Sequence, residues 1–338
     1  MHMILLTGGA GYIGLHTAAV LIEAGHEVVL FDNFSNSKPL GLTRLEAVVG
    51  RAVPCVEGDV RSRQDLDGLF DQYPVSAVVH FAGLKAVGES QTQPLRYYDN
   101  NVSGSLVLLA AMQRAEVRRI VFSSSATIYG NADANPIPET AALRPANVYG
   151  RSKLMVEDIL RDLHVAAPGW SIALLRYFNP VGAHPSGLIG EDPNGIPNNL
   201  MPYVTQVAVG RLAQLQVFGG DYPTPDGTGV RDYIHVMDLA EGHRAALDWA
   251  LRDPHGILTA NLGSGQGCSV LELVRAFERA SGQAIPHRIV ARRAGDVPAY
   301  WADPALARQV LGWSARRSLD DICLDAWNWQ RSNPQGFA

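Results

Sequence analysis

Short apolar runs alternate with stretches of helical periodicity through the first half of the chain. The runs lie at 4–7, 27–31, 53–57, 77–81, 119–123 and 171–176. Between them, apolar residues recur three and four positions apart, as on the buried face of a helix. Strands that alternate with helices in this way predict an α/β fold built on a Rossmann-type, doubly wound parallel sheet.

The amino-acid composition of the chain changes after about residue 180. Glycine, proline and asparagine dominate 182–186 and 190–199, and irregular backbone of this length is usually functional. A helix at about 200–210, a strand at 215–218 and a helix at about 237–251 follow. We therefore expect a first domain over 1–180 and a smaller, mixed α/β substrate domain over 181–338. Within the second, about 233–262 could pack back on the first.

The first apolar run leads directly into Gly8, Gly11 and Gly14, and then into a helical pattern. Such glycines allow a tight turn, close approach of a pyrophosphate and tight packing of helix on sheet. A glycine loop alone is common. Here the second strand also ends in Asp32, which is placed to bind an adenosine ribose; a simple strand-end turn residue is the alternative that this context disfavours. Together these features predict dinucleotide binding. NAD is favoured over NADP, because the Asp32 carboxylate would repel a 2′-phosphate and 33–36 contain no arginine to bind one.

In a doubly wound sheet, ligands lie beyond the carboxyl ends of the strands. Asp59 follows the third strand and could meet the adenine. Small residues at 81–85 follow the fourth strand, and the hydroxyl-rich run 123–127 follows the fifth, near the expected nicotinamide. The sixth strand is followed by 177–180, where the first domain is expected to end and the second to begin.

Tyr149 and Lys153 lie four residues apart in a predicted helix and so share one of its faces. A catalytic phenol needs nearby positive charge to favour its anion at neutral pH, and Lys153 or an oxidised nicotinamide can supply that charge. Most such pairs are simply part of an amphipathic face. The dinucleotide pattern upstream is what favours a catalytic role for this one.

Composition narrows the class of protein. The chain has 338 residues, of which 47% are apolar, and a net charge of -5 with basic residues scattered in ones and twos. We therefore expect no nucleic-acid partner. Three widely spaced cysteines suggest neither a disulfide framework nor a metal site, and no apolar run is long enough to span a bilayer. The expectation is a cytoplasmic protein without a membrane partner.

Two further features leave alternatives open. The helical stretches at about 95–110 and 155–163 carry more apolar surface than one sheet contact requires, so they either only cover the sheet or also form a homodimer. Arg231 and Arg293 could each bind a diphosphate in bidentate fashion, or each could form a surface ion pair.

With these motifs assembled, the chain resembles the extended short-chain dehydrogenase/reductases, and more narrowly the UDP-glucose 4-epimerases. The resemblance extends over nearly the whole chain and includes 7–14, 81–90, 123–130, 174–186, 195–202, 227–239 and 296–303. It implies NAD-dependent, reversible epimerisation of UDP-glucose and UDP-galactose at C4 through a 4-keto intermediate. Tyr149 would be the acid and base, with Ser125 bonded to the reacting oxygen and Lys153 holding the nicotinamide ribose.

The resemblance also implies two sets of binding residues. The cofactor set is Gly8, Gly11, Tyr12, Ile13, Gly14, Asp32, Asn33, Ser35, Asn36, Asp59, Val60, Phe81, Ala82, Gly83, Lys85, Asn100, Ser123, Tyr149, Lys153, Tyr177 and Phe178. The substrate set is Lys85, Ser125, Tyr149, Phe178, Asn179, Asn199, Leu200, Gln216, Val217, Phe218, Arg231, Tyr233, Arg293, Asp296 and Tyr300.

Two positions distinguish the chain from related classes. Dehydratases of this superfamily carry an Asp-Glu pair where this chain has Ala126 and Thr127, so dehydration is disfavoured. A non-catalytic NAD-binding sensor usually lacks the tyrosine, which is present here as Tyr149. Another nucleotide-sugar epimerase stays a possible alternative. The bulky Tyr300 occupies the position that gates sugar size in the family and predicts a preference against N-acetylated sugars.

Overall fold

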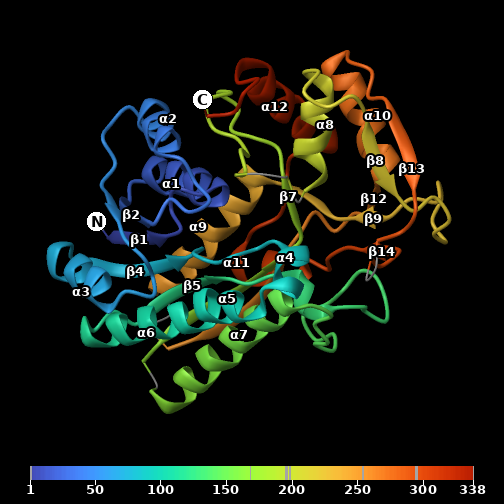
Figure 1. Cartoon of the computed structure of the whole chain (residues 1–338). Coiled ribbons are helices and arrows are strands. Elements are labelled where there is room, and N and C mark those ends of the chain that lie inside the picture. The colour runs from blue at the N-terminus through green and yellow to red at the C-terminus, as the bar shows by residue number, and fades with distance from the viewer. Residues whose placement is uncertain are drawn as a thin grey trace.

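Seven parallel strands form the central sheet of the computed structural model, which describes residues 2–167, 169–194, 197, 199–252, 255–293 and 296–337 (Figure 1). Their order across the sheet is β11-β6-β5-β4-β1-β2-β3, and every neighbouring pair is parallel. The strands are β1 (Met3–Thr7), β2 (Glu27–Asp32), β3 (Cys55–Glu57), β4 (Val75–His80), β5 (Arg119–Ser123), β6 (Ser171–Tyr177) and β11 (Ile257–Leu262). The predicted doubly wound sheet is confirmed, and β1 and β4 flank its topological switch point.

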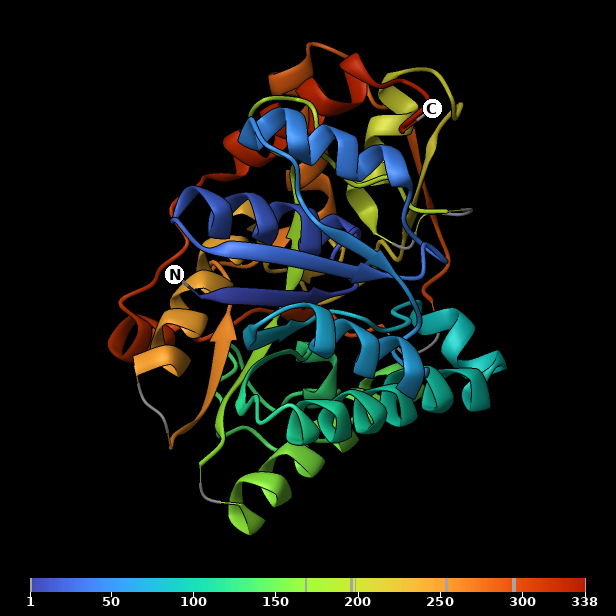
Figure 2. The same ribbon diagram turned by 90° about the vertical axis from the view of Figure 1, so that its left-hand side faces the viewer.

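Helices cover both faces of this sheet, as Figure 2 shows. Leucine, valine and alanine side chains of α1 (Tyr12–Glu23), α2 (Pro39–Val49) and α9 (Val236–Arg252) pack into one core cluster. Those of α3 (Arg63–Gln72), α6 (Gly104–Arg114) and α7 (Val148–Ala166) pack into a second cluster. The two clusters share the strands, whose alternate side chains point to opposite faces.

The helix expected at 95–110 is divided. It consists of α5 (Pro94–Tyr98), a single π-helical turn η1 (Asp99–Ser103) and the start of α6, preceded by the short α4 (Val87–Thr92). Such π-turns often occur at functional sites because they redirect side chains. Here the turn points Asn101 into the interior, where the residue is buried.

The sheet does not end with β6. The chain leaves the sheet after β6 and returns to it only after α9. It then adds β11 at the edge beside β6, with Ile257 opposite Ile172 and Leu262 opposite Tyr177. The sheet of the first half is therefore completed by a strand from the second half.

The remainder forms a smaller mixed α/β region, which also confirms the predicted fold class. α8 (Leu200–Ala208), α10 (Val270–Ser281) and α12 (Leu319–Ser332) surround a separate core cluster with β8 (Leu215–Phe218), which pairs with β13 (His287–Val290). Short elements join it to the sheet: β7 (Asn179–Val181), β9 (Val230–Arg231), β10 (Tyr233–His235), β12 (Cys268–Ser269), β14 (Ala299–Tyr300) and α11 (Ala305–Leu311). Across the described ranges, the helices are too short or too polar to cross a membrane.

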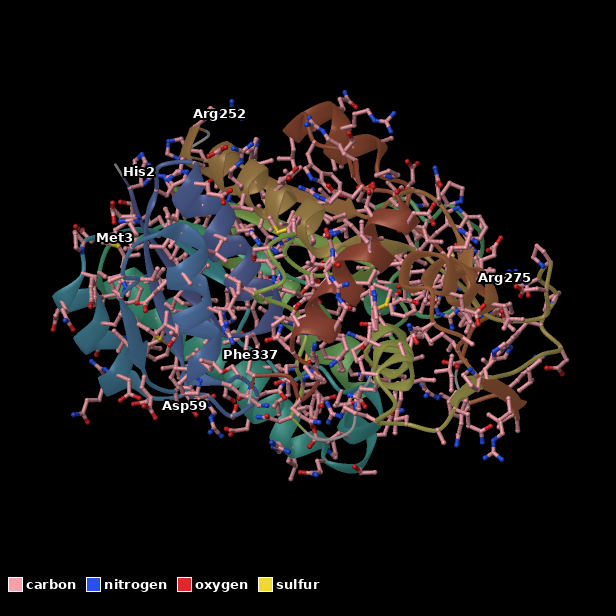
Figure 3. All side chains as sticks on the ribbon, turned by 90° about the horizontal axis from the view of Figure 1, so that it is seen from above. His2, Met3, Asp59, Arg252, Arg275 and Phe337 are labelled. Atoms are coloured by element: carbon pink, nitrogen blue, oxygen red, sulfur yellow. The ribbon has the colours of Figure 1, made fainter. Side chains whose placement is uncertain are left out.

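The C-terminal tail folds back onto the N-terminal helices. Figure 3 places Phe337 between α12 and these helices. Its ring lies 4.7 Å from that of Trp329 in α12, and its backbone N–H donates to Asp192 at 2.8 Å. Asp192 also pairs with Lys38, just before α2, at 2.6 Å. The tail and the segment around Asp192 thus connect the smaller region to the loop that follows β2.

Candidate active site

The glycine turn after β1 packs closely on the exit of β4. Gly8 has a φ of +67°, and a Cβ there would lie 2.7 Å from the backbone nitrogen of Ala82. A Cβ on Gly14 would lie 2.6 Å from the carbonyl oxygen of Gly8, so α1 can approach the turn only with glycine at this position. Gly11 caps α1, whose first turn, beginning with Tyr12 and Ile13, has no acidic residue. The turn is therefore a cradle that suits a pyrophosphate.

Asp32 links the end of β2 to this turn. Its carboxylate accepts hydrogen bonds from the Ala10 N–H at 2.9 Å, from the Phe34 N–H at 2.9 Å and from the Ser37 hydroxyl at 2.8 Å. Burial raises the pKa of Asp32, although these three bonds oppose the rise. Nearby, Asn33 donates to Asp59 at 3.1 Å, so the ends of β2 and β3 lie together. Ser35 and Asn36 are exposed beside them, and Val60 is buried.

The segment after β4 is held by the π-helical turn. The side chain of Asn101 accepts from the Leu84 N–H at 2.7 Å and from Asn100 at 3.0 Å. It also donates to Ser152 of α7 at 3.1 Å. A Cβ on Gly83 would lie 3.3 Å from Lys153 Nζ, so glycine leaves room for the lysine. The turn thereby holds the segment that begins with Phe81 and Ala82 against α7.

Ser125, Tyr149 and Lys153 come together beyond β5. The Asn147 side chain caps α7 by accepting the Gly150 N–H at 2.8 Å. A Cβ on Gly150 would lie 2.9 Å from the Thr127 carbonyl oxygen, so α7 starts close against the serine turn. The three candidate catalytic side chains are each less than a tenth exposed. The sequence-predicted catalytic set is therefore one buried cluster.

Electrostatics within this cluster depend on burial. Burial raises the pKa of Tyr149, whereas a hydrogen bond from Ser125 lowers it. Burial lowers the pKa of Lys153 to about 8, which still leaves the ammonium largely charged at neutral pH. Its Nζ donates to the Ser123 carbonyl at 2.8 Å. The Ser123 hydroxyl in turn lies 2.5 Å from that of Tyr177.

The smaller region closes the site from the other side. The ring of Phe178 lies 4.9 Å from that of Tyr300, and both residues are buried. Asn179 pairs with Tyr233 in the short β7–β10 sheet. Phe178 and Tyr300 also pack in one core cluster with Ala126, the residue after Ser125, so these two predicted substrate residues lie next to the serine turn.

The other predicted substrate residues lie on elements around this wall. Asn199 precedes Leu200, the first residue of α8, and donates to Glu191 at 2.9 Å, while Lys85 pairs with the same carboxylate at 3.2 Å. The guanidinium of Arg293 lies 3.8 Å from the ring centre of Phe218, which is in β8 with Gln216 and Val217.

Arg231 donates to the backbone carbonyl groups of Val230 and Val297, and lies 4.0 Å from Asp296. It therefore already has partners in the protein. Of the loops expected to bind substrate, Gly195, Ile196, Asn198, Ala294 and Gly295 lie outside the described residues.

Comparisons with known proteins agree with this geometry. The model of the NAD dependent epimerase/dehydratase family matches residues 4–263. A UDP-glucose 4-epimerase from Bacillus subtilis is 57% identical over 99% of this chain and 98% of its own, and one from Dictyostelium discoideum is 53% identical over 99% and 97%. The chain belongs to the UDP-glucose 4-epimerases of this family.

A solved UDP-glucose 4-epimerase shares the whole fold. The enzyme from Bifidobacterium longum, determined in complex with NAD+ and UDP, superimposes with a TM-score of 0.95 at 52% identity, covering 99% of both chains. Membership of an NAD-dependent family agrees with the two features expected to bind the cofactor, the glycine turn after β1 and Asp32 at the end of β2.

Replacing Asp32 by alanine should weaken NAD binding and reduce the preference for NAD over NADP. The carboxylate is the predicted ribose ligand, and a hydrogen bond to a charged group is worth roughly 1.5–3 kcal/mol, or about 10- to 100-fold in Kd. Titration of the variant with both cofactors measures the change. Ser37→Ala is the matched control, because it removes one bond to Asp32 and keeps the charge. An unchanged NAD to NADP ratio in Asp32→Ala would contradict the ribose role.

Two residues next to the site were not singled out in the sequence. Glu157 is a fully buried acid, and Arg176 is a base that is only 2% exposed. Both carried a signal: Glu157 follows Lys153 by four residues on the same helical face, and Arg176 interrupts the apolar run of β6. His235 is also buried, and it accepts the Met237 N–H at the start of α9.

Proposed function

We propose that the protein interconverts UDP-glucose and UDP-galactose by reversible epimerisation at C4, with Tyr149 as the acid and base. The observation that carries the proposal is the buried cluster of Ser125, Tyr149 and Lys153, placed beside a dinucleotide cradle at the switch point of the sheet. Close relatives with the same fold are UDP-glucose 4-epimerases, which supports this assignment.

NAD, when bound, supplies a hydride acceptor that becomes the donor for the return step. Tyr149 takes the proton of the 4-hydroxyl as hydride leaves C4, and gives it back when hydride returns to the other face of the ketone. Ser125 holds the reacting oxygen by a hydrogen bond. Burial raises the pKa of Tyr149, and the positive charge of Lys153 is assigned the role of favouring the phenolate.

Anchoring of the nucleotide is expected to lie away from the reacting carbon. We assign UDP binding to residues of the smaller region: Asn179, Asn199, Phe218, Arg231, Arg293 and Asp296. The two arginines suit a diphosphate, which would take the place of their present neighbours. Such distant anchoring lets the flat ketone turn over in the site while the UDP moiety stays bound.

The first experiment is an assay without added cofactor. The purified protein is mixed with UDP-galactose, and UDP-glucose is quantified by chromatography while the absorbance of reduced nicotinamide is followed. We expect conversion towards an equilibrium mixture without accumulation of NADH. No conversion, even with NAD supplied, would refute the proposal.

Tyr300→Cys should allow turnover of UDP-N-acetylglucosamine. Tyr300 is 9% exposed and packs on Phe178, so its bulk fills space beside the expected sugar. Removing the ring makes room for an N-acetyl group, and we expect a gain of at least about tenfold in kcat/KM, equivalent to about 1.4 kcal/mol. Tyr300→Phe keeps the bulk and serves as the control without a gain. If the cysteine variant gains nothing either, Tyr300 is not the gate.

A homodimer is the assembly we infer. Leu95, Leu106 and Met155 are 81%, 48% and 41% exposed on α5, α6 and α7, which lie beside one another (Figure 2). Apolar side chains exposed on adjacent helices suit a symmetric helical interface with a second copy. A mass near that of one chain, 36.5 kDa, in light scattering would exclude the homodimer.

We place the activity in the cytoplasm, because the three cysteines are free thiols, as in a reducing compartment.

A further inference from the structure

A buried ion pair lies directly behind the catalytic cluster. Arg176 donates from Nε to Glu157 Oε1 at 3.0 Å and from Nη2 to Oε2 at 2.7 Å. The geometry is bidentate, which is the strongest arrangement of these two groups. Burial alone raises the pKa of Glu157, but the bonds from Arg176 bring it below its ordinary value. Glu157 is therefore an ionised hydrogen-bond acceptor at neutral pH.

Glu157 has a further partner in the serine turn. The Ser124 hydroxyl donates to Glu157 Oε1 at 2.5 Å. Ser124 lies between Ser123, whose carbonyl accepts from Lys153, and Ser125 of the catalytic cluster. α7 is thus fixed to the exit of β5 at two consecutive helical turns, first by Lys153 and then by Glu157. The second of these attachments lies next to Ser125 in the chain.

The other end of the serine turn is fixed by Arg176. Its Nη1 donates to the Tyr129 hydroxyl at 3.1 Å, and that hydroxyl donates to Asn261 of β11 at 2.7 Å. Tyr129 ends the short 3-10 helix η2 (Ala126–Tyr129), which begins immediately after Ser125. The Glu157–Arg176 pair therefore holds the chain on both sides of Ser125.

We propose that Glu157 is a positioning residue for the proton transfer, because it holds Ser124, and through it Ser125, where the Ser125 hydroxyl can bond to the Tyr149 phenol. The inference rests on the proposed epimerisation, in which Ser125 and Tyr149 act on the same sugar oxygen. Glu157 itself touches neither of them. It acts by fixing the position of Ser125, because a displaced Ser125 hydroxyl could not form the hydrogen bond to the Tyr149 phenol.

Ser124→Ala tests this role with a small change. The variant removes the bond from Ser124 to Glu157 and leaves both bonds from Arg176. We expect kcat for UDP-galactose to fall about tenfold or more, while KM stays within about twofold, because UDP binds elsewhere. Since the bond from Ser125 lowers the pKa of Tyr149, its loss should move the acid limb of the kcat–pH profile to higher pH.

Arg161→Ala is the matched control. Arg161 is about one third exposed on α7 and donates to Glu157 Oε2 at 2.8 Å, and its other hydrogen bonds go to Asp158 and Thr259, outside the serine turn. Its removal should leave kcat and the pH profile as in the wild type. Glu157→Met combined with Arg176→Met is a second variant, which lacks the attachment altogether. It should be slowed at least as much as Ser124→Ala.

The outcomes separate the two proposals. Wild-type kcat and an unmoved pH profile in Ser124→Ala would overturn the positioning role. A lower kcat with an unmoved pH profile would also overturn it, since that result indicates only a structural effect. Equal NAD content in all variants, read from absorbance after denaturation, excludes cofactor loss. A wild-type protein without epimerase activity would instead contradict the proposed function.

Discussion

Tyr149→Phe should lower kcat by roughly 10²–10⁴-fold, the usual contribution of a general acid or base. The phenol is buried in the catalytic cluster, and its only change is the loss of the hydroxyl that would exchange a proton with the sugar. Phenylalanine keeps the ring, so packing against neighbouring side chains is preserved. The measurement is the initial rate of UDP-galactose conversion at saturating substrate.

Binding in the same variant provides the control. NAD content and the Kd for UDP should stay close to those of the wild type, because Tyr149 is one member of a large predicted cofactor set and the residues assigned to UDP lie elsewhere. A variant that retains near-normal kcat would assign the proton transfer to another group. A variant that loses NAD would show that the hydroxyl holds the cofactor as well.

Glu157→Met should destabilise the folded protein by about 3–5 kcal/mol, the usual cost of leaving one charge of a buried pair without its partner. Arg176 stays protonated at neutral pH, and among the described residues it would keep the Tyr129 hydroxyl and the Glu139 carbonyl as acceptors. Arg176→Met should cost less, since Arg161 and Ser124 still bond to Glu157. Urea unfolding at a fixed NAD concentration measures both changes.

The double variant, Glu157→Met with Arg176→Met, completes a double-mutant cycle of unfolding free energies. With both residues replaced by methionine no buried charge is left alone, so the free energy of unfolding should return towards that of the wild type. Strict additivity of the two single effects would mean that the pair is not coupled. Recovered stability with a low kcat would separate the role of this pair in folding from its role in positioning Ser125.

The alternation of apolar runs predicted six strands of the central sheet within about two residues, because fully buried parallel strands depend mainly on local composition. Val53 was expected in the third strand, which instead begins at Cys55. The segment of about 233–262 was expected to pack back on the first domain, but the strand β11 within it was not predicted. Its membership of the sheet depends on pairing with Ile172 to Tyr177, and such a contact between distant segments leaves no periodic signal at 257–262. The π-helical turn at Asp99–Ser103 was missed for a similar reason: Asn101 is drawn inward by Leu84 and Ser152, which are distant in sequence.

The reacting part of the site was easier to predict than the part behind it. Glycine turns, a strand-end acid and a Tyr-x-x-x-Lys pair are local patterns, and the structure brings these residues to one edge of the sheet. The Glu157–Arg176 pair depends on α7 and β6 meeting, so its two members could be noticed in the sequence but not paired. The roles assigned to the UDP-binding residues stay predictions.

Because β11 is translated long after its neighbour β6, the central sheet stays incomplete during much of translation. As the chain emerges from the ribosome, β6 is complete long before its neighbour Ile257–Leu262 exists. During that interval the nascent sheet exposes an apolar edge strand, which invites pairing with other chains. Translation of the second half at normal speed, or a chaperone that shields this edge, should therefore matter more to the yield of this protein than to that of a Rossmann domain whose strands are all consecutive.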